Sequence, residues 1–413
     1  MDQLLRSHAD RIVSRAIQAV LPDRAVQRAL EGQTFPGRVF LAAAGKAAWQ
    51  MAQAAWQVLG DAITDGVVVT KYDHVKGPIG SLRCFEGGHP VPDENSFLGT
   101  RAVLEMTAQL TEEDTVLFLL SGGGSALFED PLIDGEELQD VTRQLLACGA
   151  DIQEMNTIRK RLSRVKGGRF ALHCAPAQVF SIVLSDVLGD PLDMIASGPA
   201  APDGSTCAQA LAIAEKYGLR FSSRVMDLLA RETPKVLTNV RNHVTGSVRE
   251  LCSAAAEAAR ELGYEPQILT DRLCCEAREA GRMLGSTLVS HAGSPRPLAF
   301  IAGGETVVKL TGKGLGGRNQ ELALAAAELL DGIPGTAVFS VGSDGTDGPT
   351  DAAGGSPDYT TADLLKTKGI SLSQILAEND SYHALSACDG LIFTGPTGTN
   401  VNDVSLALWN PNC

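Results

Sequence analysis

The chain has 413 residues, of which 44% are hydrophobic and 20% charged, and its formal net charge is −14. This hydrophobic content supplies packed cores for two or three domains and excludes a disordered chain. The acidic excess disfavours a general nucleic-acid-binding protein, which normally presents more lysine and arginine than aspartate and glutamate.

Short apolar runs alternate with longer amphipathic stretches along the chain, which is typical of a doubly wound α/β fold. The predicted strands are 38–43, 66–70, 115–120, 179–184, 266–270, 298–302, 306–310, 336–341 and 391–394. The predicted helices are 46–59, 95–110, 136–148, 248–262, 274–291 and 318–330. A continuous apolar strand such as VLFLL at 116–120 indicates a sheet that is covered on both faces. The segment ETP at 232–234 breaks the pattern, so we place a domain boundary near residue 235.

The first motif is FLAAAGKAA at 40–48, where a strand ends at Gly45 and Lys46 stands at the mouth of the next helix. The carboxyl ends of strands face the ligand crevice of a doubly wound sheet, and a lysine there can neutralise a transferring phosphoryl group. The N-terminus of a helix carries a partial positive charge, so a lysine without a function is disfavoured there. This favours a functional role for Lys46. The chain has no G-x-x-x-x-G-K-[ST] sequence, so this is not a Walker A motif.

A second motif follows the strand at 115–120. It is a run of three glycines between two serines: Ser121, Gly122, Gly123, Gly124 and Ser125. Three glycines let successive backbone N–H groups converge at a helix start, and the hydroxyl groups can donate to phosphate or carboxylate oxygens. A plain turn needs fewer glycines, so we expect an anion-binding loop. We expect His89, in GGHP at 87–90, to support the structure or orient a substrate rather than act as a base.

A basic block at 156–169 concentrates positive charge in this acidic protein. Its cationic residues are Arg159, Lys160, Arg161, Arg164, Lys166 and Arg169. Arg159 and Lys166 are seven residues apart, which predicts that they share one helical face. No aromatic residues interleave with them, so an RNA-binding interpretation is weak. We expect Arg159, Lys166 or both to contact an anionic substrate; an exposed basic helix face is the alternative.

Carboxylates follow two of the predicted strands. Asp186 stands at the end of 179–184, and Asp190 follows a glycine turn. Asp344 and Asp351 lie in the loop GSDGTDGPTDAAGG after strand 336–341, whose spacing does not match an EF-hand. Mg²⁺ usually takes one or two carboxylates together with phosphate oxygens and waters, so Asp190 and Asp351 are the predicted metal ligands. Capping of a turn explains each aspartate about equally well.

A second glycine-rich loop, GKGLGG at 312–317, leads to Arg318 and Asn319 at a helix start, and Glu305 precedes it. We expect this loop to bind a second anion or to form a lid over phosphate. It matches G-x-G-x-x-G only superficially, because no acidic residue on a following strand is placed to bind a ribose. The polar turn at 394–403 also follows a strand, but its role stays open.

The nine cysteines are odd in number and form no C-x-x-C pair, which is typical of reduced thiols in a cytosol. Residues 1–17 show an amphipathic helix pattern with charges throughout, unlike a signal peptide. No stretch approaches the roughly 18 apolar residues of a membrane span. We therefore expect a cytoplasmic protein that binds neither membrane nor nucleic acid. The oligomeric state stays open, with a homodimer as one option.

Together these motifs resemble those of the MOFRL family of glycerate 2-kinases. The resemblance covers nearly the whole chain in order: AAGKA, GGHPVPDENS, LSGGGSAL, RKRLSRVKGGR, SDVLGDPLDMIASGP, GGETVVKLTGKGLGGRNQE, GSDGTDGPTDAAGG and GPTGTNVNDV. One departure is Arg161, which stands where the family pattern has a histidine and leaves the substrate contact there open.

The resemblance implies a Rossmann-like N-terminal domain at 1–235 with a doubly wound, mostly parallel sheet. It implies a three-layer C-terminal MOFRL domain at 236–413 with a mixed sheet, and an active site in the cleft between the domains. The implied reaction transfers the γ-phosphoryl group of ATP, with Mg²⁺, to the 2-hydroxyl of D-glycerate, giving 2-phosphoglycerate and ADP. Lys46 and Arg318 are then the residues most needed for activity.

On this hypothesis the 121–125 loop and the basic block hold anionic oxygens. Glu305, Asn319 and Asp344 contact substrate or phosphate, and Asp186 accepts the hydroxyl proton. Two alternatives remain. An NAD(P)H-dependent hydroxypyruvate reductase is disfavoured because a convincing dinucleotide fingerprint is lacking. A non-catalytic sensor of sugar acids or nucleotides is disfavoured by the intact Lys46 and Arg318 motifs.

Overall fold

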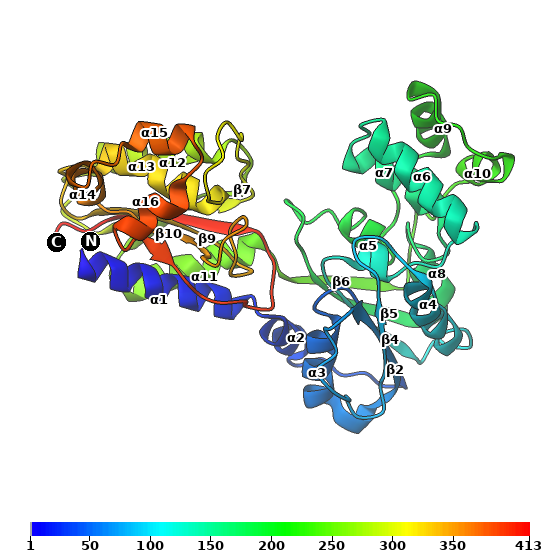
Figure 1. Cartoon of the computed structure of the whole chain (residues 1–413). Helices are drawn as coiled ribbons and strands as arrows, with labels where there is room; N and C mark the ends of the chain where they lie inside the picture. The colour runs from blue at the N-terminus through cyan, green and yellow to red at the C-terminus, as the bar shows by residue number, and fades with distance from the viewer. Residues whose placement is uncertain (1) are drawn as a thin grey trace. The chain divides into compact units, whose positions relative to one another are not determined.

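The computed structural model describes residues 2–413, which form two compact units. The first unit is Pro22–Thr245, and the second is Gly246–Cys413 together with the residues that precede Pro22. Each unit is built around one six-stranded sheet (Figure 1). The boundaries of these units differ from those of the predicted domains, 1–235 and 236–413, both at the N-terminus and near residue 235. The last strand of the first sheet extends past residue 235, and the N-terminal helix belongs to the second unit.

The first sheet has the strand order β3-β2-β1-β4-β5-β6, as in a doubly wound fold. Its strands are β1 (Val39–Ala44), β2 (Ile63–Lys71), β3 (Arg83–Gly87), β4 (Thr115–Leu120), β5 (Gln178–Leu184) and β6 (Val240–Gly246). The neighbours from β3 through β5 pair in parallel, so their carboxyl ends meet at one edge of the sheet. The strand order changes direction between β1 and β4, where such folds bind their ligands. The predicted doubly wound, mostly parallel sheet is confirmed.

Helices cover both faces of the first sheet, because alternate residues of each buried strand enter different cores. The helices are α2 (Pro22–Leu30), α3 (Ala48–Leu59), α4 (Glu94–Met106), α5 (Gly124–Leu127), α6 (Gly135–Ala147), α7 (Ile152–Arg159), α8 (Arg169–Cys174), α9 (Cys207–Lys216) and α10 (Ser223–Leu229), with the short 3-10 turns Gly60–Ala62, Lys160–Leu162 and Ile195–Ser197. Leu41 of β1 packs in a core with α2 and α3, whereas Ala42 packs in a core with α4 and α8. A third core joins α6, α7, α9 and α10.

The second sheet is mixed and has the strand order β11-β10-β9-β12-β8-β7. Its strands are β7 (Glu265–Leu273), β8 (Leu298–Gly304), β9 (Thr336–Gly342), β10 (Gly354–Gly355), β11 (Leu391–Ile392) and β12 (Asp403–Trp409). Strands β7 and β8 are parallel, whereas β12 is antiparallel to both β8 and β9. The predicted mixed sheet is confirmed.

Two helical layers enclose the second sheet, with α1 and α11 on one face and α12 and α13 on the other (Figure 1). The helices are α1 (Gln3–Ala19), α11 (Val248–Glu261), α12 (Ala277–His291), α13 (Arg318–Leu330), α14 (Thr361–Thr367), α15 (Leu372–Ala377) and α16 (Ser381–Ala387). The predicted strand at 306–310 is wrong. Val307 makes only an isolated bridge with Glu276, and Leu310 is 80% exposed, so this apolar run has no sheet to bury it. The three layers are therefore those expected, built from a slightly different set of strands.

Candidate active site

Lys46 lies at the carboxyl edge of the first sheet, in the turn that joins β1 to α3. Its backbone N–H donates to the carbonyl oxygen of Gly122 at 2.9 Å, which ties this turn to the loop after β4. Gly45 permits the approach, since a Cβ at this position, with φ of +122°, would lie 2.3 Å from Ser121 Oγ. The Lys46 side chain is half-buried, and its ammonium group makes no ion pair or hydrogen bond within residues 2–413. This cation is therefore free to bind an anion at the β1–β4 switch point.

The 121–125 loop offers two backbone donors beside Lys46. In the part of the chain that the structure describes, the N–H groups of Gly122 and Gly123 donate to no acceptor. Gly124 N–H is used within the loop, at 3.3 Å from Ser121 O, and Ser121 Oγ accepts from the N–H of Ala47 at 3.1 Å. The helix that follows, α5, has only four residues, so the expected contribution of a helix dipole is small. Anion binding here depends on the two free amides instead.

Side chains from three strand ends converge on the Gly122–Gly123 peptide. A Cβ on Gly122 would lie 2.3 Å from Asp186 Oδ2, in the segment after β5. A Cβ on Gly123, whose φ is +84°, would lie 3.1 Å from Cγ of Lys46 and 3.0 Å from Cδ2 of His89, in the loop after β3. Only glycine leaves room for these neighbours. The parallel sheet thus brings Lys46, His89 and Asp186 together around one loop.

Arg159 supplies a second cation next to this loop, at the end of α7. Its Nη2 donates to the carbonyl oxygen of Ser125 at 3.3 Å, while its Nε is buried without a partner among residues 2–413. Burial lowers the pKa of Arg159, although the charge of Glu129 opposes this effect. The Ser125 hydroxyl lies 3.0 Å from that of Ser197, which in turn donates to the side chain of Asn156. A desolvated guanidinium without a carboxylate partner fits a bound anion.

Two other members of the basic block, Lys166 and Arg161, are buried and have structural roles. Lys166 is fully buried, where its ammonium is paired with Glu129 and donates to Phe128 O at 3.1 Å. Burial lowers the pKa of Lys166 to about 8. Arg161 is also fully buried and donates to Ser205 O at 3.0 Å. The seven-residue spacing predicted a shared face, but α7 ends at Arg159 and a 3-10 turn follows. Lys166 therefore points into the core, out of reach of a ligand.

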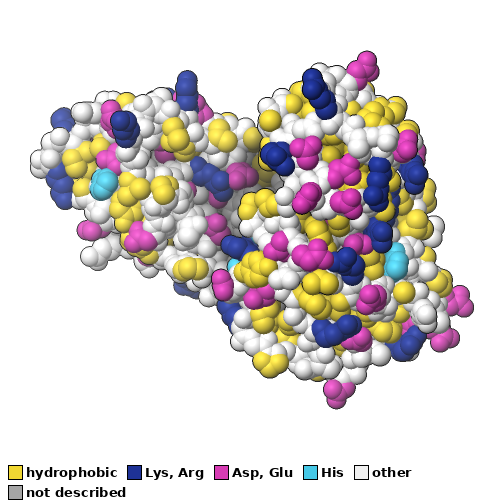
Figure 2. Space-filling view, turned by 45° about the vertical axis from the view of Figure 1, so that its right-hand side comes forward, with side chains coloured by type: hydrophobic (Ala, Val, Ile, Leu, Met, Phe, Trp, Pro, Cys, Tyr) yellow, Lys and Arg dark blue, Asp and Glu magenta, His cyan; other side chains and the backbone are white. Residues whose placement is uncertain are grey.

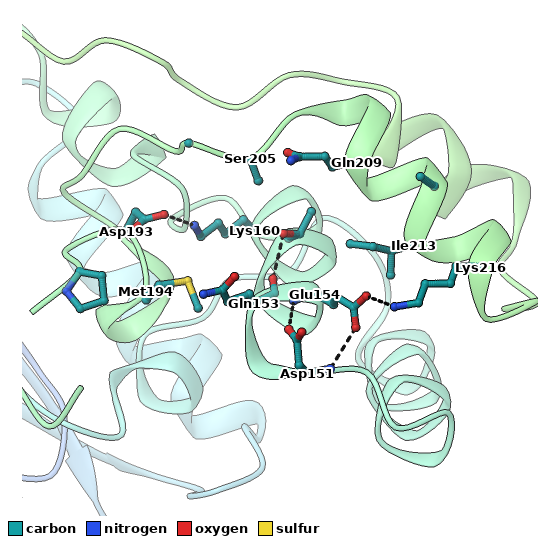
Figure 3. Close-up of a pocket in the computed structure, with 14 residues that line it drawn as sticks. Asp151, Gln153, Glu154, Lys160, Asp193, Met194, Ser205, Gln209, Ile213 and Lys216 are labelled. Atoms are coloured by element: carbon teal, nitrogen blue, oxygen red, sulfur yellow. Dashed lines mark hydrogen bonds and ion pairs between the residues drawn. The ribbon is translucent and has the colours of Figure 1, made fainter. Parts of the chain in front are cut away.

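A pocket of about 700 Å³ lies between α7 and α9, and Figure 3 shows its lining side chains. Lys160 reaches its wall but is held by Asp193 at 3.2 Å and by Asp203 at 3.0 Å. On the opposite side Lys216 is paired with Glu154 at 2.6 Å (Figure 3). Because its cations are neutralised by carboxylates, this pocket lacks the unpaired charge found beside Lys46.

The predicted metal ligands lie in different units. Asp190 follows Asp186 in the first unit, and its Oδ1 is buried with no hydrogen bond within the described chain. Asp351, in the second unit, accepts a hydrogen bond from the hydroxyl of Tyr382 at 2.8 Å. Among residues 2–413, no group of three or more histidine, cysteine or acidic side chains is placed to hold a metal ion. Mg²⁺ does not require such a protein-only cage, because it usually takes one or two carboxylates together with phosphate oxygens and waters.

Arg318 is the main cation of the candidate site in the second unit. Its Nε and Nη2 donate to the carboxylate of Asp403 at 2.6 and 3.0 Å, and Nη1 donates to Glu305 at 2.7 Å. A guanidinium has five N–H donors, and these bonds use three of them, so two remain for a ligand. Although burial opposes it, the hydrogen bonds and charge of Asp403 raise the pKa of Arg318. Sequence reasoning assigned no role to Asp403, which begins the unpredicted strand β12.

Asp344 and Asn319 are the remaining residues of the second unit that are predicted to contact substrate or phosphate. The side chain of Asp344 is accessible, and that of Asn319 is buried. Asp344 is half-buried, and its Oδ1 accepts from the N–H of Thr346 at 3.0 Å. Asn319 is 1% exposed and bonds to Ser340 and Asp347, so it holds the start of α13 rather than facing a ligand. Asp347 accepts from the backbone N–H groups of Asn319 and Gln320 and thereby caps α13.

Figure 2 shows lysine and arginine side chains interspersed with aspartate and glutamate over the face that it presents. This face has no extended surface of one sign such as nucleic-acid binding requires. Within residues 2–413, no helix combines the length and the apolar character that crossing a membrane requires.

Two family models match the chain. The one described as a domain of unknown function, DUF4147, matches residues 8–230, and the MOFRL family model matches residues 298–403. The D-glycerate 2-kinase of Thermotoga maritima is 55% identical over 410 residues, which are 98% of each chain. A crystal structure of glycerate kinase from the same organism superposes with a TM-score of 0.95, at 53% identity, over 99% of this chain and 100% of that one. An Agrobacterium vitis protein named provisionally as a hydroxypyruvate reductase is 37% identical over 96% of this chain and 93% of its own.

Proposed function

Since the chain belongs to the family of proteins that joins a DUF4147 domain to a MOFRL domain, we propose that it is a D-glycerate 2-kinase. It transfers the γ-phosphoryl group of ATP to the 2-hydroxyl of D-glycerate and releases 2-phosphoglycerate and ADP. The observation that carries the proposal is the unpaired ammonium of Lys46 beside the two free amides of the 121–125 loop. Phosphoryl transfer needs such fixed positive groups more than it needs covalent chemistry.

The two cations of the first unit, Lys46 and Arg159, bind different substrates. Lys46, with the N–H groups of Gly122 and Gly123, holds oxygens of the transferring phosphoryl group. Arg159 binds the carboxylate of glycerate, because a guanidinium pairs with a carboxylate in two-point geometry and this one has no carboxylate partner within residues 2–413. The Ser125 hydroxyl lies next to it and can donate to the same anion.

Mg²⁺ would be held by Asp190, whose Oδ1 has no partner in residues 2–413, and by Asp186 on the same turn. When bound, the ion neutralises phosphate charge and orients the phosphate oxygens. Asp186 and Asp190 contribute carboxylate oxygens only, so the transfer still depends on Lys46 for a fixed protein cation.

Arg318 supplies the cation of the second unit, and Asp403 and Glu305 hold its guanidinium in place. That Lys46 and Arg318 act on the same phosphoryl group, in a cleft between the domains, stays a prediction. A double-mutant cycle tests it. If the residues act together, the double variant Lys46→Ala/Arg318→Ala loses much less than the product of the two single losses.

A hydroxypyruvate reductase activity has less support. A dinucleotide-binding sheet carries a G-x-G-x-x-G turn after its first strand, so that the pyrophosphate meets a helix start. Here the turn after β1 is AAGKAA, which places a lysine at that position. A nicotinamide absorbance assay with hydroxypyruvate, run beside the kinase assay, separates the two activities.

The proposal is tested by measuring D-glycerate-dependent ADP release. We expect Lys46→Ala and Arg318→Ala each to lose on the order of 10²- to 10³-fold in kcat while folding normally. Lys366→Ala, an exposed lysine of α14, is the matched control and should keep full activity. Near-normal turnover in both active-site variants contradicts the proposal.

A further inference from the structure

The His89 ring has no hydrogen-bond partner, although it lies against the glycine loop. Within residues 2–413 neither of its ring nitrogens makes a hydrogen bond. His74, in the neighbouring loop, differs, because its Nδ1 lies 2.8 Å from the carbonyl oxygen of Lys46. The ring of His89 reaches Gly123 with its Nε2 edge, 3.1 Å from the place of a Cβ on that glycine. A half-buried imidazole that lies against this loop and lacks a partner within residues 2–413 leaves its ring nitrogens available to hydrogen-bond with a substrate group.

The surroundings of His89 keep its ring neutral. Burial lowers the pKa of His89, and the positive charges of Lys46 and Lys71 lower it further. Acidic groups also lie nearby. Asp93 caps α4 and accepts from the N–H of Gly88, Glu86 accepts from the N–H of His74, and Asp186 lies over Gly122. Asp93 and Glu86 are thus bound to backbone donors, and Asp186 approaches Gly122, whereas His89 approaches Gly123. At neutral pH the ring therefore carries one nitrogen that can accept a proton.

We propose that His89 is the proton acceptor for the glycerate hydroxyl that becomes phosphorylated. This inference rests on the proposed kinase function. As the hydroxyl oxygen forms its bond to phosphorus, the bond from phosphorus to the ADP oxygen breaks. The hydroxyl proton passes to the free ring nitrogen of His89 and from there to water. Lys46 stabilises phosphoryl oxygens beside the ring. The stabilising cation and the proton acceptor therefore both lie against Gly123.

This assignment differs from the expectation that Asp186 takes the proton and that His89 only orients or supports. A carboxylate normally titrates near pH 4, whereas an imidazole titrates near 6.5. Because an efficient base has a pKa near the working pH, the imidazole is better matched to a neutral-pH reaction. Asp186 would then serve, with Asp190, to hold Mg²⁺.

The test compares His89→Gln with Asp186→Asn by steady-state kinetics from pH 4.5 to 8.5. Glutamine keeps hydrogen-bonding atoms but cannot take up the proton. We expect kcat of His89→Gln to fall by roughly 10²- to 10⁴-fold, with a smaller change in KM for glycerate. We also expect kcat/KM of the wild type to rise with pH through an apparent pKa below 6.5, and this rise to vanish in His89→Gln only.

Several outcomes overturn the proposal. His89→Gln could keep its kcat and its pH profile, or Asp186→Asn could be the variant that loses the rise. The wild-type profile is informative even if His89→Gln does not fold, because a wild-type kcat/KM that stays flat over the whole range from pH 4.5 to 8.5 also overturns it. His173→Gln, an exposed histidine of α8, is the control and should match the wild type. If the wild type releases no ADP with glycerate, the kinase function fails instead.

Discussion

Gly123→Ala tests whether the crowding around the glycine loop positions the active site. The φ of Gly123 is +84°, and an L-residue in this region costs roughly 1–2 kcal/mol of folding free energy. The new methyl group would also lie 3.0 Å from His89 Cδ2 and 3.1 Å from Lys46 Cγ. Both side chains then have to move by a few tenths of an ångström. Since a misplacement of about 1 Å can cost about 10²-fold, we expect kcat/KM to fall on the order of 10-fold or more.

Gly149→Ala is the matched control for the backbone cost. Gly149 has φ of +75°, but nothing lies within 4 Å of a Cβ built on it. Urea unfolding, followed by circular dichroism, should show a similar loss of stability in both variants. Steady-state ADP release should show a loss of activity in Gly123→Ala alone. If Gly123→Ala keeps the activity of Gly149→Ala, the crowding at Gly123 does not position Lys46 and His89, and the reasoning is refuted.

Three further predictions concern the supports of the site. Lys166→Met should lower the free energy of unfolding by about 3–5 kcal/mol, because it leaves Glu129 buried without its partner. The double variant with Glu129→Leu should recover much of that loss in urea unfolding, and no recovery contradicts the pairing. Asp403→Asn should lower kcat roughly 10²-fold, because it weakens the bidentate clamp on Arg318; an unchanged kcat contradicts this. Although burial opposes it, hydrogen bonds from Thr233 and neighbouring donors lower the pKa of Asp203 to about 2. Its stabilising contribution is thus complete above pH 4 and is lost as the pH falls toward 2. Asp203→Asn should flatten that part of the unfolding free energy's pH dependence, and an unaltered slope contradicts it.

Much of the fold could be predicted from local sequence patterns. The buried strands are continuous apolar runs bounded by glycine turns, and β1, β4 and β5 lie close to the predicted ranges. The errors arise where burial depends on distant partners. Leu310 belongs to an apolar run that finds no sheet, whereas β12 follows a polar turn and becomes a strand because β8 and β9 flank it. Such pairing depends on strands that are distant in the sequence, so a short stretch of sequence does not reveal it.

The sequence indicates the main elements of the candidate site, Lys46 and the 121–125 loop, but not the side chains that surround them. Lys46 and the 121–125 loop follow strand ends, and a parallel sheet brings strand ends together whatever the length of chain between them. Lys166 and Asn319 are predicted from the sequence to contact substrate or phosphate, but both side chains are buried, because charge and spacing do not reveal that a side chain points into a core. The GGHP motif marks His89 as a structural or substrate-orienting residue but does not reveal its neighbours. Its contact with Gly123 depends on how the loops after β3 and β4 pack.

Phosphorus NMR of the product tests the central claim most directly. Purified wild-type protein is incubated with ATP, Mg²⁺ and D-glycerate, beside Lys46→Ala at equal concentration. We expect the wild type to give the resonance of 2-phosphoglycerate together with ADP, and Lys46→Ala to give neither at a comparable rate. A 3-phosphoglycerate product, no phosphorylated glycerate, or an equal rate in Lys46→Ala would contradict a Lys46-centred transfer to the 2-hydroxyl.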